Sequence, residues 1–230
     1  YLRRYFLLER ELSESLNAFN QTDPNVDLRS AKSIIDKLFA VSDDEVDWQK
    51  IAVANTLNKQ FSVIAGGPGT GKTYTVTKLL AALIMNEHSN SLDIRLVAPT
   101  GKAAQRLAES IGAAVAGFEG QIDQAILEQI PSDAQTIHRL LGVIPNQVNF
   151  RHRQDNKLLA DVVIIDEVSM VDLPLMTRLF RALPEHCKVI MLGDADQLPS
   201  VAAGGVLADL APRPHAGFTS GNQRFLNGVL

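Results

Sequence analysis

The sequence contains little of what marks secreted or membrane-spanning proteins. Cys187 is the only cysteine among the 230 residues, so no internal disulfide can form, which fits the reducing cytoplasm. No apolar run reaches the roughly 18 residues that a membrane-spanning helix needs, so we expect no membrane span. The chain starts at Tyr1 with neither a Met nor a signal-peptide pattern, and we therefore expect it to be part of a longer protein.

An excess of positive charge is also lacking. The formal net charge is -4, so the composition gives no support for nucleic-acid binding. It does not exclude such binding, because phosphate contacts depend on a local track of Lys and Arg rather than on the sum over the chain. With 46% hydrophobic and 21% charged residues and no internal repeat, the composition is that of an ordinary globular protein.

Short apolar runs alternate with helical patterns through most of the chain. Each run is aliphatic or β-branched and is bounded by Gly, Pro or Asp. Strands that are apolar throughout and alternate with helices predict an α/β fold, with a parallel sheet covered by helices on both faces. In such sheets, ligands bind beyond the carboxyl ends of the strands. The predicted strands are Phe61–Ala65, Arg95–Ala98, Val162–Ile165 and Val189–Leu192, and the predicted helices are Thr73–Met85, Lys102–Ile111 and Leu173–Leu183.

The two ends of the chain differ from this α/β region, which we expect over 46–212. Apolar side chains recur at helical spacing before it, so we expect a helical N-terminal segment over 1–45. Residues 213–230 contain Pro and Gly among scattered apolar residues and indicate a connector towards a further domain. In the N-terminal segment, the apolar residues at helical spacing are Tyr5, Leu8, Leu12, Leu16 and Phe19, and then Ala31, Ile34, Ile35 and Leu38.

A phosphate-binding pattern directly follows the first predicted strand. Gly66–Thr73 has the sequence GGPGTGKT, which matches G-x-x-x-x-G-K-[ST] between a strand and a helix. Glycines let backbone N–H groups turn onto phosphates, and the helix N-terminus adds partial positive charge. Lys72 would contact the β- and γ-phosphates, and Thr73 would offer its hydroxyl to Mg²⁺. A plain glycine turn is the alternative, but the strand and helix context favours nucleotide binding.

Two adjacent acids end the third predicted strand. Asp166 is the expected Mg²⁺ residue, and Glu167 is the expected general base that polarises the attacking water. Asp-Glu pairs are also common on protein surfaces, but this pair follows an apolar strand downstream of the phosphate-binding pattern. A base at this place favours a hydrolase over a small-molecule kinase, whose bound substrate is itself the nucleophile.

A helix start with basic residues follows the second predicted strand. Pro99 and Thr100 end that strand, and the helix then presents Lys102 and Arg106 on one face. A Thr and backbone amides at a helix start can hold a nucleic-acid phosphate. A solvated helix face explains the same residues, and the pattern alone does not decide between the two.

Two further segments contain polar residues of possible function. Gln197 follows the fourth predicted strand and is a candidate sensor of the γ-phosphate, although a turn built from Gly and Asp explains the segment equally well. His138 and Arg139 lie at the start of a short helix, where a lone His is more often structural than functional.

In their order along the chain, these segments resemble the motifs of superfamily 1 helicases. Gly66–Thr73 is similar to motif I, Ala98–Leu107 (APTGKAAQRL) to motif Ia, Thr136–Leu141 (TIHRLL) to motif Ib, Asp166–Met170 (DEVSM) to motif II and Gly193–Val201 (GDADQLPSV) to motif III. Gln49 resembles the Q motif, which recognises adenine. The resemblance implies a P-loop NTPase with a RecA-like domain that uses ATP and Mg²⁺ to move along nucleic acid.

The expected site residues follow from the motifs and this resemblance together. The ATP-binding residues are Gln49, Gly66, Gly67, Pro68, Gly69, Thr70, Gly71, Lys72, Thr73 and Tyr74. The catalytic residues are Lys72, Glu167 and Gln197, and the metal residues are Thr73 and Asp166. The DNA contacts are Pro99, Thr100, Lys102, Arg106, His138 and Arg139.

The wording of the motifs narrows the resemblance to one branch. APTGKAA, TIHRLL and DEVSM are similar to the RecD branch, the alpha subunit of exodeoxyribonuclease V, and YLRRYF resembles the segment ahead of its motor. This resemblance implies 5′-to-3′ movement on single-stranded DNA, RecB and RecC as partner subunits, and a role in double-strand-break repair. RecD-like enzymes that act without these subunits and relaxase-type helicases share most of this wording and stay open as alternatives.

The same family has a second RecA-like domain with motifs IV to VI, and an arginine of that domain completes the ATP site. No segment after Asp194 resembles those motifs, so we expect the chain to bind nucleotide, to hydrolyse ATP weakly and to unwind nothing alone. A nucleotide-dependent switch or scaffold and an RNA helicase are the other function classes that the motifs leave open.

Overall fold

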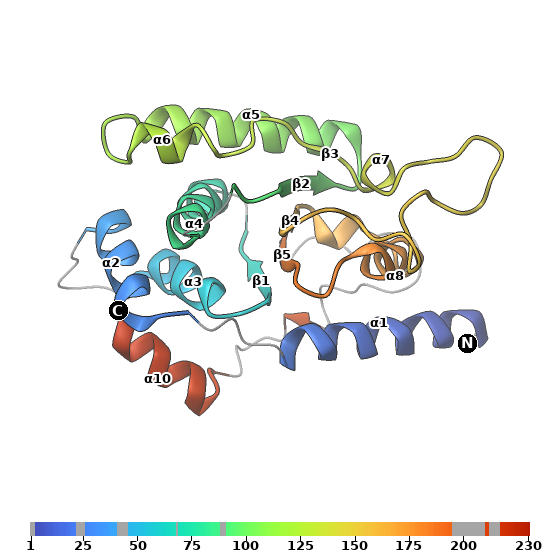
Figure 1. The fold of residues 1–230 in the computed structure, drawn as a ribbon, viewed down its shortest axis with the longest axis horizontal. Coiled ribbons are helices and arrows are strands. Elements are labelled where there is room, and N and C mark those ends of the chain that lie inside the picture. The colour runs from blue at the N-terminus through green and yellow to red at the C-terminus, as the bar shows by residue number, and fades with distance from the viewer. Residues whose placement is uncertain are drawn as a thin grey trace.

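A parallel sheet of five strands forms the centre of the molecule (Figure 1). The computed structural model describes residues 3–21, 26–40, 46–67, 69–87, 91–194, 210–211 and 217–230. The order of the strands across the sheet is β1-β5-β4-β2-β3, and all neighbours are parallel. The predicted strands are confirmed, but the sequence pattern misses β3, because two polar residues give no periodic signal. The strands are β1 (Phe61–Ala65), β2 (Ile94–Ala98), β3 (Gln135–Thr136), β4 (Val162–Ile165) and β5 (Lys188–Gly193).

Helices cover both faces of the sheet, as the apolar strands predict. Along β4, Val162 and Ile164 point into one core while Val163 and Ile165 point into the other, because successive side chains of a strand alternate between its faces. None of the helices in the described ranges is long and apolar enough to cross a bilayer. The first core contains α2 (Leu28–Leu38), α3 (Trp48–Leu57), α4 (Lys72–Asn86), α5 (Gly101–Gly117), α6 (Gln124–Leu127) and α10 (Ser220–Val229); the second contains α1 (Arg3–Gln21), α7 (Ile137–Leu141), the 3₁₀ turn η1 (Val168–Met170) and α8 (Leu173–Ala182).

The two N-terminal helices pack on opposite faces of the sheet. On one face, Ile35 of α2 is fully buried in the first core. On the other face, α1 lies along α8 (Figure 1), where the rings of Phe19 and Phe180 meet edge-on with centroids 5.6 Å apart. Glu11 of α1 accepts two hydrogen bonds from the guanidinium of Arg181 in α8, at 2.5 and 2.6 Å. Within the described residues, the helices expected over 1–45 are therefore part of the α/β fold: α2 belongs to the first core and α1 to the second.

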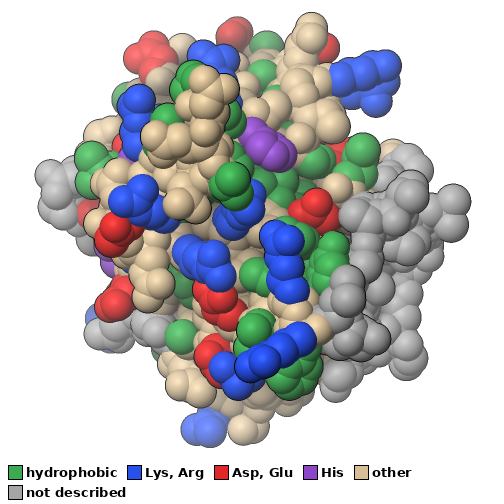
Figure 2. Space-filling model, turned by 90° about the vertical axis from the view of Figure 1, so that its right-hand side faces the viewer, with side chains coloured by type: hydrophobic (Ala, Val, Ile, Leu, Met, Phe, Trp, Pro, Cys, Tyr) green, Lys and Arg blue, Asp and Glu red, His purple; other side chains and the backbone are tan. Residues whose placement is uncertain are grey.

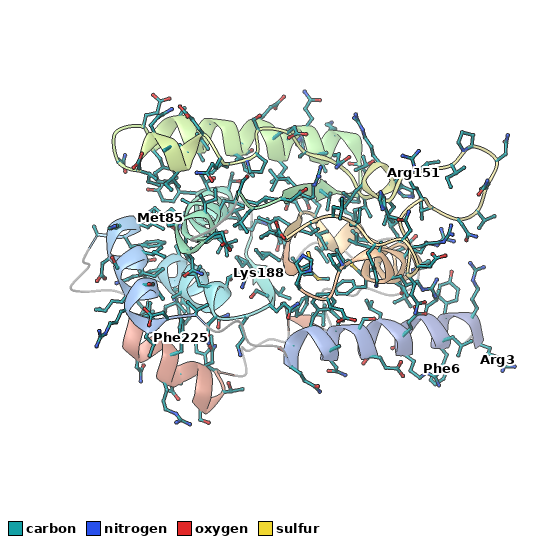
Figure 3. All side chains as sticks on the ribbon, in the orientation of Figure 1. Arg3, Phe6, Met85, Arg151, Lys188 and Phe225 are labelled. Atoms are coloured by element: carbon teal, nitrogen blue, oxygen red, sulfur yellow. The ribbon has the colours of Figure 1, made fainter. Side chains whose placement is uncertain are left out.

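The C-terminal residues contain a helix that returns to the body of the molecule. Phe225 of α10 is buried in the first core (Figure 3). The side-chain amide of Asn222 donates to Oδ1 of Asn55 in α3 at 2.5 Å. The described part of the segment 213–230, for which the sequence indicates a connector, thus packs against α2 and α3. Glycine lowers the helix propensity of this segment, so its sequence gives only a weak helical signal. The contacts with α2 and α3 stabilise the helix in the folded chain.

The register of the sheet places the carboxyl ends of its strands level with one another. Ala65 at the end of β1 pairs with Gly193 at the end of β5. Ile165 at the end of β4 pairs with Val97 in β2 on one side and with Met191 in β5 on the other. The segments that follow these strands therefore begin at one edge of the sheet, where open α/β sheets bind their ligands.

Replacing Glu11 by Gln should loosen α1 from α8. The hydrogen bonds from Arg181 are the largest cause that lowers the pKa of Glu11 below its ordinary value of 4.5. The stabilisation is therefore fully present above the ordinary pKa and is lost as the pH falls through the lowered pKa of the folded state. Because both side chains are more than a third exposed, at 38% and 37%, we expect a loss of about 1 kcal/mol or less at neutral pH.

Urea unfolding of the wild type and the Glu11→Gln variant at neutral and strongly acidic pH measures this difference. Glu14→Gln on the same helix is the matched control, because the side chains of its pair with Arg10 are 70% and 62% exposed. A stability difference between Glu11→Gln and the wild type that stays the same at both pH values would contradict the role of the ion pair.

Candidate nucleotide site

The loop between β1 and α4 has the backbone of a phosphate cradle. The N–H of Gly66 donates to the carbonyl of Gly193 at 3.1 Å, which ties the start of the loop to β5. Gly69 and Gly71 both have a φ of 76°, in the left-handed region that glycine enters without steric cost. Gly71 is the N-cap of α4, so the first N–H groups of this helix point towards the loop. Pro68, which the sequence places in the same loop, lies outside the described residues.

A cavity of about 550 Å³ opens between this loop, α3 and the C-terminal segment. Gly66, Thr70 and Lys72 of the loop line it, and so does Gln49 of α3. The volume lies in the range of small-ligand sites. Residues that the motifs do not contain complete the wall, among them Trp48, Ile51, Ala52, Thr75, Leu210 and Phe218.

Some of the residues predicted to bind ATP lie beside this cavity rather than in its wall. Gly67, together with Gly69 and Gly71, belongs to the loop itself, and Thr73 follows Lys72 in the first turn of α4. Tyr74 does not reach the cavity. Its ring packs against that of Phe118, with centroids 4.5 Å apart, and it is not among the residues that line the cavity.

The helix α3 that contains Gln49 is fixed at both ends. Asp47 caps its start, where the carboxylate accepts hydrogen bonds from the N–H of Gln49 and of the next residue, each at 2.9 Å. At its end, the ammonium of Lys188 donates to the carbonyl of Thr56 at 2.8 Å (Figure 3). Between these anchors, the amide of Gln49 approaches the loop so closely that a Cβ on Gly71 would lie 2.6 Å from its Nε2.

Two carboxylates lie at the end of β4, as the sequence predicts. The N–H of Asp166 donates to the carbonyl of Val97 at 2.8 Å, and Glu167 has a φ of 51°, a strained value for a residue other than glycine. Burial raises the pKa of Asp166, and burial followed by the charge of Asp166 raises the pKa of Glu167. The charge of Lys72 lowers both pKa values, so the acids lie within electrostatic reach of the cradle. Gln197, the candidate sensor, lies outside the described residues.

The oxygen donors of Thr73 and Asp166 fit a Mg²⁺ ion that arrives with a nucleotide. Mg²⁺ prefers oxygen ligands, and in nucleotide sites one or two protein groups hold it together with phosphates and water. Across the part of the chain that the structure describes, no group of three His, Cys, Asp or Glu could hold a metal by itself.

Comparison with known proteins shows the family to which the chain belongs. A family model described as an AAA domain matches residues 49–203, which contain the cradle and both acids. The chain belongs to the AAA domain family. It is 46% identical over 180 residues to the RecBCD enzyme subunit RecD of Haemophilus influenzae. The aligned residues cover 77% of this chain and 28% of that protein. It is 39% identical over 215 residues to the subunit of the same name from Mycolicibacterium smegmatis. The aligned residues cover 91% of this chain and 37% of that protein.

A third relative has a different name. The chain is 42% identical over 149 residues to the ATP-dependent RecD2 DNA helicase of Deinococcus radiodurans, covering 65% of this chain and 17% of that protein. The resemblance to RecD proteins that the motifs predict is thus confirmed. The chain spans between 17% and 37% of the length of these curated relatives.

The residues predicted to contact DNA follow strands that end at the same edge of the sheet. Those on α5 come directly after β2, and those on α7 come directly after β3. The charge of Arg106 lowers the pKa of Glu167, which places this part of α5 near the acids. The exposed members of the set are Thr100, Lys102, Arg106, His138 and Arg139, and Pro99 is half-buried.

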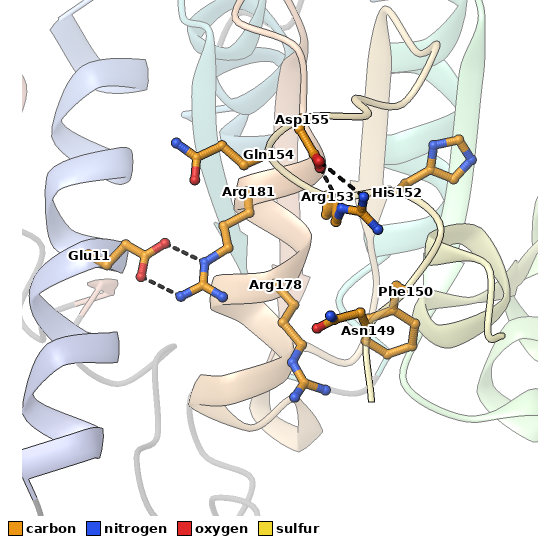
Figure 4. A pocket seen from close by; sticks show the side chains of 9 residues that line it. All are labelled: Glu11, Asn149, Phe150, His152, Arg153, Gln154, Asp155, Arg178 and Arg181. Atoms are coloured by element: carbon orange, nitrogen blue, oxygen red, sulfur yellow. Dashed lines mark hydrogen bonds and ion pairs between the residues drawn. The ribbon is translucent and has the colours of Figure 1, made fainter. Parts of the chain in front are cut away.

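A second cavity, of about 840 Å³, lies between α1, α8 and the segment 149–155 (Figure 4). The guanidinium of Arg178 lies over the ring of Phe150, 5.4 Å from its centroid, and the ring of His138 meets the same Phe150 at 5.7 Å. Phe150 thus joins this cavity to one of the predicted DNA contacts. Figure 2 shows Lys and Arg side chains gathered on this end of the molecule. No motif predicts the cavity, because its walls come from segments far apart in the sequence.

Replacing Gly71 by Ala should weaken nucleotide binding through Gln49. An Ala side chain at a φ of 76° is strained, and its Cβ would lie 2.6 Å from Nε2 of Gln49, so the amide of Gln49 must move away from the loop. We expect ATP affinity to fall roughly tenfold or more, as measured by isothermal titration calorimetry.

Gly69→Ala is the matched control for this variant. Gly69 has the same φ of 76°, but a Cβ there meets no atom within 4 Å. This control should lose less affinity than Gly71→Ala. Equal losses in the two variants would show that backbone strain alone is responsible and that the contact with Gln49 has no effect.

Proposed function

We propose that this chain is the ATP-binding core of a DNA helicase motor of the RecD type. The observation that carries the proposal is the common edge of the sheet. The cradle, the acid pair and the exposed basic residues of α5 and α7 all follow strands that end at this edge. A motor that holds a nucleic-acid strand while it hydrolyses ATP requires this proximity.

In the proposed reaction, the triphosphate of ATP lies in the cradle and its base lies towards α3. Lys72 holds the β- and γ-phosphates, and Glu167 polarises a water molecule for attack on the γ-phosphorus, which releases phosphate from ADP. The buried surroundings that raise the pKa of Glu167 make its carboxylate a stronger base. Thr73 and Asp166 would hold Mg²⁺, and the bound ion would supply positive charge that offsets the charge on the phosphate oxygens.

Single-stranded DNA is the proposed track, with movement in the 5′-to-3′ direction. The proposed partners are RecB and RecC, in cytoplasmic double-strand-break repair. The relatives named as RecBCD subunits match 77% and 91% of this chain, whereas the RecD2 helicase matches 65%. This difference supports the subunit over the alternative, a RecD-like helicase that acts without RecB and RecC.

Two variants of the full-length parent protein test the ATP site. Lys72→Ala should reduce nucleotide affinity at least tenfold or so, because the cradle loses its only side-chain cation. Glu167→Gln should keep nucleotide binding but reduce turnover by roughly a hundredfold or more. Both are measured as ATP affinity and as ATP turnover with and without single-stranded DNA.

Lys37→Ala, an exposed change on α2, is the control and should leave affinity and turnover unchanged. Normal turnover in the Glu167→Gln variant would contradict its role as general base. If the ATP turnover of the wild type is the same with and without single-stranded DNA, even when candidate partner subunits are present, a nucleotide-dependent switch is favoured instead. Stronger stimulation by RNA than by DNA of the same sequence would favour an RNA helicase.

A further inference from the structure

The nucleotide cavity contains an indole with most of its surface in solvent. Trp48 is the first residue of α3 and is 69% exposed, although it lines the cavity beside Gln49. A single exposed apolar side chain needs no explanation on a protein surface. An exposed indole in the wall of a ligand cavity is different, because a bound ligand would cover its large apolar face.

The side of α3 on which Trp48 lies faces the cavity along the length of the helix. Trp48, Ala52 and Asn55 all line the cavity, and their spacing of four and three residues places them on one stripe of the helix. The cap formed by Asp47 and the contact of Lys188 at the other end hold this stripe in place. The position of the indole at the cavity is therefore set by the helix as a whole.

The cavity is lined by polar and by apolar groups. The cradle with Lys72 supplies groups that suit phosphates, and Trp48 and Ile51 of α3 together with Phe218 of the C-terminal segment supply apolar surface. A nucleotide combines charged phosphates with a flat base. Once the cradle holds the phosphates, these apolar side chains are the part of the lining that suits the base.

We propose that Trp48 stacks on the adenine base of the bound nucleotide. This inference rests on the proposed function, because it concerns the same ATP site. Stacking uses the face of the base and is tolerant of its identity, so Trp48 supplies affinity for the base rather than selectivity between bases.

Fluorescence tests the stacking directly, because Trp48 is the only tryptophan in the 230-residue chain. Saturating ATP should quench the emission of the wild-type chain. Tripolyphosphate, which offers the phosphates without a base, should bind and leave the emission unchanged. Calorimetry confirms the binding of each ligand independently. ATP that binds without changing the emission would overturn the proposal.

A set of variants measures what the stacking contributes. Trp48→Ala should reduce ATP affinity roughly tenfold and leave the affinity for tripolyphosphate unchanged. Trp48→Phe keeps an aromatic face and should retain most of the ATP affinity. Val46→Ala is the matched control, because Val46 is also an exposed apolar residue, at 64%, but does not line the cavity. A Trp48→Ala variant that binds ATP as tightly as the wild type would overturn the proposal.

The inference and the proposed function fail in different ways. If neither ATP nor tripolyphosphate binds and Lys72→Ala makes no difference, the nucleotide site is wrong and the inference falls with it. If both ligands bind and Trp48→Ala alters neither affinity, the cradle stands and only the stacking is wrong.

Discussion

The parallel register of β1, β5, β4 and β2 is the constraint on which the rest of the structure depends. It brings the end of β1 level with the end of β5, and the end of β4 level with that of β2. Segments as far apart in sequence as those after Ala65 and Gly193 therefore begin at one edge of the sheet. The proposed ATP site needs this arrangement, because the cradle at Gly66–Thr73 and the acids Asp166 and Glu167 would have to act on the same γ-phosphate. A change that shifted the register would separate them even if every local motif stayed intact.

Packing on both faces of the sheet keeps this edge in place. The N-terminal helices divide between the two faces, so α2 supports α4 behind the cradle while α1 supports α8 through Glu11 and Arg181. On the nucleotide side, α3 is fixed at one end by Asp47 and at the other by Lys188 of β5. The helix that presents Gln49 and Trp48 is thus bonded to the sheet whose edge forms the rest of the site. The proposed nucleotide site and the packing of the sheet are therefore linked through the same helix.

The sequence predicts those parts of the site that are encoded by consecutive residues. The cradle, the acid pair and the start of α5 each follow a short apolar strand, so their positions at the sheet edge follow from the pattern. It does not predict β3, whose two residues are too few for a period, or the packing of α10, which depends on contacts with α2 and α3. Phe218 and the wall around Phe150 and Arg178 come together only in the folded chain. Trp48 offers one local signal, its place next to Gln49, but nothing in the motif says which way an indole at a helix start points.

The central claim is that one edge of the sheet couples a nucleotide to a nucleic-acid strand. It is tested most directly by the affinity of the full-length parent protein for single-stranded DNA, with and without a non-hydrolysable ATP analogue and Mg²⁺. The account predicts that the analogue changes this affinity by roughly fivefold or more, and that DNA changes the affinity for the analogue by the same factor, because coupling between two sites is reciprocal. An affinity for DNA that is the same with and without the analogue would contradict it.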